Sequence, residues 1–231
     1  MSSGKLNEIL KELRSHSNPE NVTGMARFGI NPKNTYGVSI PVLRGLAKRL
    51  GKNHFLAGEL WLSGVHEARI LAALIDDPKL VTEAQMECWV KDFDSWDVCD
   101  SCCMNLFDKS EFAYSKALEW SERQEEFVKR AGFALMASLA FHDKNPGKDA
   151  ALARFLPVIK RESIDERNYV RKAVNWALRQ IGKRSKGLNE KAVRTAREIR
   201  KLDSKAAKWI ASDALRELES AAVQNRLHQK G

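Results

Sequence analysis

Apolar residues recur along most of the chain with the three- and four-residue spacing of one helix face, and polar residues fill the positions between them. No stretch alternates apolar with polar residues and is rich in Val, Ile and Thr, as a β-strand would be. The pattern therefore predicts an all-α protein. The expected helices cover residues 5–15, 40–50, 55–62, 67–75, 83–93, 126–141 and 169–183, and Gly and Pro fall mostly between them.

Several of the expected helices resemble one another. Residues 66–75, 127–135 and 169–178 each combine a basic residue near the start, small residues in the middle and a leucine near the end, and 204–218 repeats this more loosely. With 98–107 as another copy, the spacing is about 30 to 42 residues, which is typical of paired-helix repeats of the HEAT or armadillo kind. Such repeats stack into a curved solenoid with a concave surface. The alternative is an ordinary helical bundle with alanine-rich packing faces.

The length and composition favour one domain. A chain of 231 residues with 43% hydrophobic content can bury a continuous core, and no linker divides it, so we expect a single domain over 1–231 with 222–231 as a flexible tail. No apolar run approaches the length of about 18 residues that a membrane span needs, and the polar residues 1–5 do not resemble a signal peptide. We therefore expect a soluble, cytoplasmic protein.

The four cysteines crowd into one part of the chain, at Cys88, Cys99, Cys102 and Cys103, whereas a disulfide framework would spread them. Reduced thiols are the favoured interpretation. The spacing of Cys99 and Cys102 is compatible with zinc, but neither a second pair nor a nearby histidine completes a tetrahedral site. No metal site is expected.

The charge balance favours an anionic partner, because the sequence contains 39 Lys and Arg residues but only 30 Asp and Glu residues. Around Trp176, Lys172 lies at i−4, Arg179 at i+3 and Lys183 at i+7, so one helix face carries them all. This face could follow a nucleic-acid backbone, or Trp176 could be a core residue with basic side chains reaching past it to solvent. A second basic run over 183–208 is either a phosphate-binding surface or a solvated helix face.

Trp96 and Asp100 are four residues apart, which places them on one face of a helix. An aromatic plane beside a carboxylate in a basic protein suggests a site for something cationic, such as the oxocarbenium ion that develops when a glycosidic bond breaks. The alternative is that Asp94 or Asp97 caps the helix and that Trp96 belongs to the core. Glycosidases ordinarily use two carboxylates, and the sequence does not identify a second one.

Other catalytic signatures are missing from the sequence. It has no Gly-x-Ser-x-Gly, no glycine-rich phosphate loop, no His-Glu-x-x-His and no dinucleotide fingerprint. The five histidines are scattered and form no cluster along the chain. Ordinary surface or capping roles are expected for them.

Over nearly its whole length the chain resembles the AlkD-type DNA alkylation repair glycosylases, which are built from HEAT-like helical repeats. The specific matches are Ser-Trp-Asp-Val-Cys-Asp at 95–100 and Lys-Ala-Val-Asn-Trp-Ala-Leu-Arg at 172–179. Weaker matches occur at 18–20, 25–28, 37–41 with Arg44, and 129–131. The resemblance implies a right-handed solenoid of HEAT-like repeats with a concave basic face.

The resemblance also implies an activity, the hydrolysis of the N-glycosidic bond of cationic alkylated purines, N3-alkyladenine and N7-alkylguanine, in duplex DNA. In that activity Asp100 would stabilise the oxocarbenium-like sugar and orient the attacking water, while Trp96 and Trp176 would pack on the deoxyribose and the backbone. The resemblance implies a phosphate contact for Arg130, which joins Lys172, Arg179 and Lys183 of the basic face around Trp176 as the expected DNA-binding residues. The implied enzyme is a monofunctional glycosylase, without metal or cofactor, that acts as a monomer on DNA.

The sequence departs from the family pattern at three positions. Ser95 stands where a second tryptophan can occur, Phe28 where tyrosine can occur, and Ser39 where the side chain can be longer and polar. These differences bear on lesion preference more than on the chemistry. The family also contains members without glycosylase activity, so one alternative is a non-catalytic protein that binds distorted or branched DNA. Another is a HEAT-repeat scaffold for an acidic protein.

Overall fold

The computed structural model describes residues 2–229, with side chains from residue 4 onward. Every regular element in these residues is a helix, which confirms the all-α prediction. Long-range contacts divide the chain into two compact units, Met1–Ser110 and Glu111–Gly231, and each is described by itself. A single domain over 1–231 stays a prediction. None of the helices described is long and apolar enough to cross a lipid bilayer.

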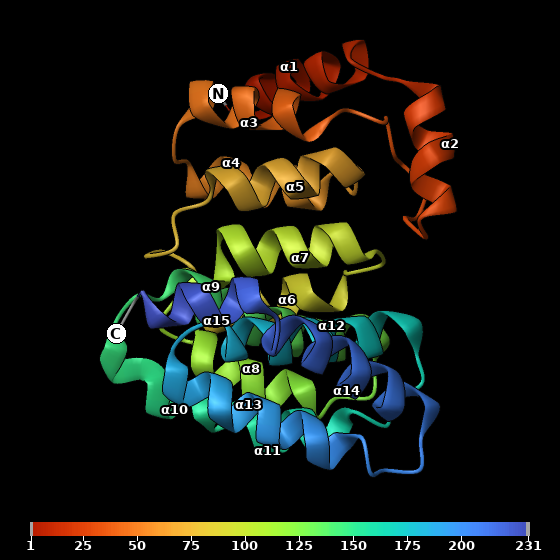
Figure 1. The fold of residues 1–231 in the computed structure, drawn as a ribbon. Coiled ribbons are helices and arrows are strands. Elements are labelled where there is room, and N and C mark those ends of the chain that lie inside the picture. The colour runs from red at the N-terminus through yellow and green to blue at the C-terminus, as the bar shows by residue number, and fades with distance from the viewer. Residues whose placement is uncertain (1, 230–231) are drawn as a thin grey trace. The chain divides into compact units, whose positions relative to one another are not determined.

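The first unit is organised around α5 (His66–Ile75), of whose ten residues eight are buried. This helix contacts α1, α3, α4 and α7, and Figure 1 shows α4 and α5 side by side. Because α5 is covered by several neighbours, its first turn can anchor segments that are distant in sequence. The other elements of the unit are α1 (Ser2–Ser15), α2 (Pro19–Arg27), α3 (Ile40–Leu50), α4 (His54–Leu62), α6 (Glu83–Lys91), α7 (Trp96–Asn105) and the 3-10 helix η1 (Phe107–Lys109).

Aromatic side chains join α4 to α6 in the first unit. The rings of Trp61 and Trp89 stack with centroids 4.1 Å apart and an interplanar angle of 2°. Phe93 meets Trp61 edge-on, and the Trp61 indole nitrogen donates a hydrogen bond of 2.8 Å to the Asp92 carboxylate. The stack buries large apolar area, while the polar edge of Trp61 keeps a partner.

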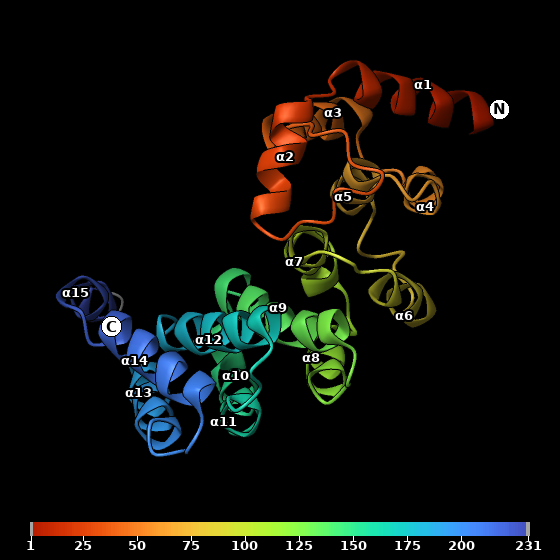
Figure 2. The same cartoon turned by 90° about the vertical axis from the view of Figure 1, so that its right-hand side faces the viewer.

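The second unit is organised around α9 (Glu126–His142), whose residues are buried without interruption from Val128 to Ala140. This helix packs against α8 and α12, and α12 also contacts α13 and α14 (Figure 2). A helix buried on all sides is expected to be largely apolar, and α9 is so apart from Lys129, Arg130 and Ser138. The two buried cations have partners, since Lys129 bonds to Glu162 and Arg130 to the Tyr169 carbonyl. The other elements are α8 (Ala113–Ser121), η2 (Pro146–Lys148), α10 (Asp149–Ala153), α11 (Phe155–Glu162), α12 (Asn168–Gly182), α13 (Lys186–Ile199), α14 (Lys205–Leu218) and α15 (Ala221–His228).

Gly132 marks the closest approach of α8 and α9. A Cβ atom at this position would lie 2.5 Å from the backbone nitrogen of Ser121 and 3.0 Å from the carbonyl oxygen of Ala117. Both are backbone atoms and cannot rotate away. The crossing of these two helices therefore requires glycine at position 132.

The repeat spacing predicted from the sequence reappears in hydrogen bonds between successive repeats. In the first unit His66 bonds to Asp97, 31 residues later. In the second unit Asn175 bonds to Asp213, which is 38 residues further along the chain. Equivalent faces of neighbouring repeats thus meet one repeat length apart, as stacked helical repeats require.

Most of the segment 222–231, for which a flexible tail is expected, is helical, and its flexibility stays a prediction. Residues 221–228 form α15, in which Val223 and Leu227 are buried and the Ser220 hydroxyl accepts from the Val223 amide. The apolar pair at i and i+4 and the capping serine stabilise this last helix against the rest of the unit. Residues 230–231 lie outside the residues described.

Candidate nucleic-acid interface

Helix α7 begins directly at Trp96, with Ser95 at the N-cap in an extended conformation. The Ser95 hydroxyl does not bond to a backbone amide of the helix and contacts the Asp97 carboxylate instead. Asp97 in turn lies 2.8 Å from the ring of His66, and Asp94 accepts a hydrogen bond of 2.6 Å from the Asn31 amide. Both acids that the sequence offered as helix caps therefore have partners elsewhere.

The His66 and Asp97 pair is largely buried, with 3% and 16% of the side chains exposed. Burial lowers the pKa of His66, but the hydrogen bond and charge of Asp97, together with the charges of Glu67 and Asp94, raise it overall. Burial likewise raises the pKa of Asp97, yet His66 and the Ser95 hydroxyl lower it overall. The two groups hold each other in the charged state, and this ion pair fixes the first turn of α7 to the first turn of α5.

Trp96 and Asp100 are both half-buried and stand one turn apart on α7. The Trp96 indole nitrogen donates a hydrogen bond of 3.0 Å to the carbonyl of Phe28, the residue that ends α2. Val98 and Cys99, between them in sequence, are fully buried. Trp96 is thus an edge residue that ties the end of α2 to α7, with part of its ring left accessible.

The segment that follows Phe28 is anchored by a buried carboxylate. Glu67 is 1% exposed and accepts backbone hydrogen bonds of 2.6 to 3.2 Å from Tyr36, Gly37 and Val38. Gly37 has a φ of 77°, and a Cβ there would lie 2.2 Å from the carbonyl oxygen of Asn18. The chain beside the partner of Trp96 is therefore held in one conformation.

The cysteines of α7 are core residues. Cys99, Cys102 and Cys103 are buried free thiols, while Cys88 on α6 is exposed. Burial raises the pKa of the Cys102 and Cys103 thiols, which disfavours the thiolate form that metal binding needs. Among the residues described, no group of three or more His, Cys, Asp or Glu side chains is placed to hold a metal ion.

In the second unit, Arg130 joins α9 to α12. Its side chain is 6% exposed, and its Nη1 donates a hydrogen bond of 2.7 Å to the carbonyl of Tyr169 in the first turn of α12. The rings of Phe127 and Tyr169 stack beside it, 5.3 Å apart. Arg130 thus positions the start of α12, and the phosphate contact that the resemblance implies for it stays a prediction.

The basic face predicted around Trp176 is present, but two of its three cations, Arg179 and Lys183, form ion pairs with Glu217. Lys172 is exposed and Trp176 is half-buried. Arg179 and Lys183 lie 2.8 Å and 2.7 Å from the two oxygens of the Glu217 carboxylate on α14. Burial raises the pKa of Glu217, but these two cations lower it overall. Half-buried Trp176 therefore fits neither interpretation fully: it is not a core residue, and the cations near it are not all free to follow a nucleic-acid backbone.

Sequence reasoning missed the acidic side of this network. Asp213 accepts a hydrogen bond of 2.7 Å from Asn175 and lies 3.4 Å from Arg179. It also missed the Arg171 guanidinium above the ring of Trp209, at 5.0 Å from the ring centroid. Partners 38 residues apart follow the repeat spacing, so aligning successive repeats is the signal that could have found them.

The predicted site residues therefore fall into two groups. Trp96 and Asp100 share one face of α7 in the first unit. Arg130 lies on α9 in the second unit, and Lys172, Trp176 and Arg179 lie on α12, with Lys183 as the residue that caps its carboxyl end. The roles of both groups in binding and catalysis stay predictions.

A solved structure and two curated relatives resemble this chain. The solved structure represents a family related to the HEAT-like repeat DNA glycosylases, with affinity for branched DNA structures; it has a TM-score of 0.75 at 20% identity and covers 92% of this chain and 95% of its own. This likeness confirms the HEAT-like fold. The uncharacterized protein Lin0241 of Listeria innocua is 27% identical over 94% of this chain and 96% of its own length. The uncharacterized Lmo0209 of Listeria monocytogenes is 26% identical over 83% and 84%.

The repeat spacing, the α7 pair and the basic α12 face are consistent with one further match that covers most of the chain. Residues 9–218 match the family model described as DNA alkylation repair enzyme. The chain therefore belongs to the DNA alkylation repair enzyme family.

Proposed function

We propose that this protein is a monofunctional DNA glycosylase that removes cationic alkylated purines, N3-alkyladenine and N7-alkylguanine, from duplex DNA. The observation that carries the proposal is the placement of Asp100 one turn after Trp96, both half-buried on α7, in a member of the DNA alkylation repair enzyme family. Family membership supports a role in DNA repair, and the α7 pair supplies the chemistry that this particular reaction needs.

The reaction needs only one carboxylate because alkylation already makes the base a cation. The bond between the sugar C1′ and the purine nitrogen breaks, and its electron pair leaves with the base, which departs neutral. Asp100 faces the positive charge that develops on the sugar and orients the water that attacks C1′. The proton of that water passes to the carboxylate or to solvent, and an abasic site remains. Trp96 and Trp176 pack on the deoxyribose and the backbone.

Binding to DNA rests on the basic surfaces of the second unit. Lys172 is exposed and free to reach a phosphate, whereas Arg179 and Lys183 must exchange part of their pairing with Glu217 for a phosphate contact. Binding that depends on such contacts weakens steeply with salt because neutralised phosphates release counterions.

The test is release of free base from duplex DNA treated with a methylating agent. The wild-type protein should release N7-methylguanine or N3-methyladenine, and Asp100→Asn should lower the rate by at least about 100-fold, the loss typical of removing one transition-state electrostatic contact. Asp94→Asn is the matched control, because Asp94 is exposed and its one described hydrogen bond is to Asn31. Equal thermal midpoints and equal DNA affinities would show that the fold is intact.

A second function is favoured by the likeness to the structure whose family has affinity for branched DNA structures. If no free base appears with any alkylated substrate, the glycosylase proposal is wrong. A preference for branched over linear duplexes, measured with the same protein, would then assign a non-catalytic binding role.

A further inference from the structure

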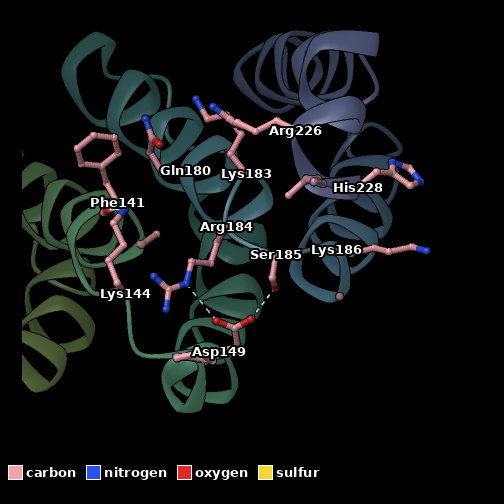
Figure 3. A pocket seen from close by; sticks show the side chains of 14 residues that line it. Phe141, Lys144, Asp149, Gln180, Lys183, Arg184, Ser185, Lys186, Arg226 and His228 are labelled. Carbon is pink, nitrogen blue, oxygen red and sulfur yellow. Dashed lines mark hydrogen bonds and ion pairs between the residues drawn. The ribbon is translucent and has the colours of Figure 1, made fainter. Parts of the chain in front are cut away.

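The second unit contains a cavity of about 950 Å³ where the ends of α9 and α12 meet the starts of α10 and α13 and the end of α15 (Figure 3). A volume in this range accommodates an organic ligand the size of a nucleotide. Of the residues to which DNA binding or excision is assigned above, Lys183 alone lines it. The proposed glycosylase function therefore does not account for this cavity.

Positive charge dominates the lining. Asp149 is the one acidic residue among those that line the cavity, and it is held by the Arg184 guanidinium at 3.2 Å and by the Ser185 hydroxyl at 2.5 Å (Figure 3). Asp149 is therefore already paired at one side of the cavity, and its charge does not offset the other cations. The basic residues that line the cavity are Lys144, Lys183, Arg184, Lys186 and Arg226.

Three of these cations form no ion pair among the described residues, although the Lys144 ammonium donates a hydrogen bond to the Phe141 carbonyl oxygen. Arg184 pairs with Asp149 and Lys183 with Glu217, but Lys144, Lys186 and Arg226 have no carboxylate partner among residues 4–229. Figure 3 shows the Lys183 and Arg226 side chains extending toward the same part of the cavity. A hollow lined by one sign of charge concentrates the electrostatic potential and attracts a multivalent anion.

Phe141 adds an aromatic surface to the basic lining of the cavity. Its side chain lines the cavity and is 50% exposed, although it sits near the end of the otherwise buried helix α9. The Lys144 ammonium lies 5.1 Å from the ring centroid. An inorganic anion would use the cations and leave the ring in water. A ligand that carries both a phosphate and a flat apolar group would use both.

We propose that this pocket binds a short stretch of single-stranded DNA, with one base stacked on Phe141 beside Lys144 and its backbone phosphates paired to Arg226 and Lys186 on the α13 and α15 side. The base must be unpaired, because a base inside a duplex already has neighbours on both faces. Basic grooves with an accessible aromatic ring are the common composition of single-strand binding sites. This site takes a strand that base excision from a duplex does not require, so it goes beyond the proposed glycosylase function.

The test compares single-strand binding by matched pairs of variants. Lys186→Ala with Arg226→Ala removes two pocket cations, and Lys191→Ala with Arg194→Ala removes two exposed cations of α13 that do not line the pocket. We expect the pocket pair to weaken binding of a labelled oligothymidine at least about tenfold in fluorescence anisotropy, and to flatten the salt dependence by about 0.7 per lost phosphate contact. The control pair should cost less than about threefold, the size expected of a change in net charge alone.

Phe141→Leu tests the stacking contribution separately. It should weaken oligothymidine binding about fivefold or more, as loss of one stacking contact does, without changing the salt dependence. The proposal is overturned if the pocket and control pairs behave alike, or if inorganic phosphate competes as well as thymidine monophosphate. Base release from methylated duplex DNA, assayed in parallel, reports the glycosylase proposal independently, so that failure of one is distinguishable from failure of the other.

Discussion

The ring of His66 lies 2.8 Å from the Asp97 carboxylate, so a buried histidine of α5 fixes the first turn of α7. Trp96 precedes Asp97 and Asp100 follows it by three residues. The ion pair therefore sets the orientation of the helix face that carries the proposed catalytic carboxylate. It acts as a positioning element, since neither partner is among the residues proposed to touch DNA.

The His66 and Asp97 pair predicts a pH dependence of stability. The pKa of His66 is raised above its ordinary value of 6.5, so its contribution is complete below that pH and is lost as the pH rises through the raised value. The pKa of Asp97 is lowered from 3.8, so its contribution is present above that pH and is lost as the pH falls through the lowered value. We expect the free energy of unfolding in urea to decrease between pH 6 and pH 9.

Asp97→Asn separates this pair from every other titrating group. The variant should lose about 2 to 4 kcal/mol at pH 6, because it leaves a buried imidazole without its counter-charge, and its stability should vary less between pH 6 and pH 9 than that of the wild type. Identical pH profiles for the two proteins would show that the pair does not contribute. His66→Gln should flatten the profile in the same way.

Glu67 predicts local loosening when its charge is removed. In Glu67→Gln the side-chain oxygen can still accept from one backbone amide, but the new NH₂ group faces other donors in the set formed by Tyr36, Gly37 and Val38. Hydrogen bonds to a buried charged group are each worth about 1.5 to 3 kcal/mol, so a loss of about 2 to 4 kcal/mol is expected. Hydrogen exchange should accelerate at the amides of Tyr36 and Val38, in the segment between α2 and α3, before it does at the amides of α5. Unchanged exchange at these amides would contradict the anchoring role.

Gly132 and Gly58 predict opposite effects of one and the same substitution. Gly132→Ala places a methyl group 2.5 Å from a backbone nitrogen and should destabilise the protein by about 1 to 3 kcal/mol. Gly58 lies inside α4 with nothing within 4 Å of an added Cβ, so Gly58→Ala should stabilise by about 0.5 to 1 kcal/mol. Thermal unfolding of the two variants measures both. A similar loss in each would mean that position 132 has room to relax.

Much of the helical layout could be predicted from the sequence because periodicity and capping residues mark helices locally. The prediction for 40–50 coincides with α3, and that for 83–93 overlaps α6 from its first residue, where Thr82 caps the helix. Helices with short or weakly amphipathic sequences were missed, α8 and α15 among them. Their stability comes from packing against neighbours, which a local pattern does not reveal.

The candidate site was only partly readable in advance. The spacing of Trp96 and Asp100 follows from helix geometry alone, and α7 has it. Partners one repeat away were invisible, because nothing local to Asp97 indicates His66, and nothing local to Arg179 indicates Glu217. The sequence therefore suggested free cations along α12, where the structure has an ion-pair network that competes with phosphate.

That competition predicts a gain of DNA affinity from removing an acid. In Glu217→Gln, Arg179 and Lys183 lose the carboxylate that now lies within 2.8 Å of each. Lys183 then becomes available to phosphates, and Arg179 keeps only its longer contact of 3.4 Å with Asp213. The cost to folding should stay below about 1 kcal/mol, because the network is partly exposed and screened. We expect duplex DNA affinity at low salt to rise about threefold to tenfold, and the salt dependence to steepen by about 0.9 for each phosphate newly contacted.

Glu219→Gln is the matched control for this gain. Glu219 lies two residues further along the chain, is exposed, and pairs with Arg197 on α13 at 2.7 Å, so its loss changes the net charge equally without releasing Arg179 or Lys183. A rise confined to Glu217→Gln, and abolished by adding Arg179→Ala, would assign the α12 face to DNA binding. If both acid variants raise affinity alike, net charge is the cause, and Arg179 and Lys183 serve the packing of α12 on α14 instead.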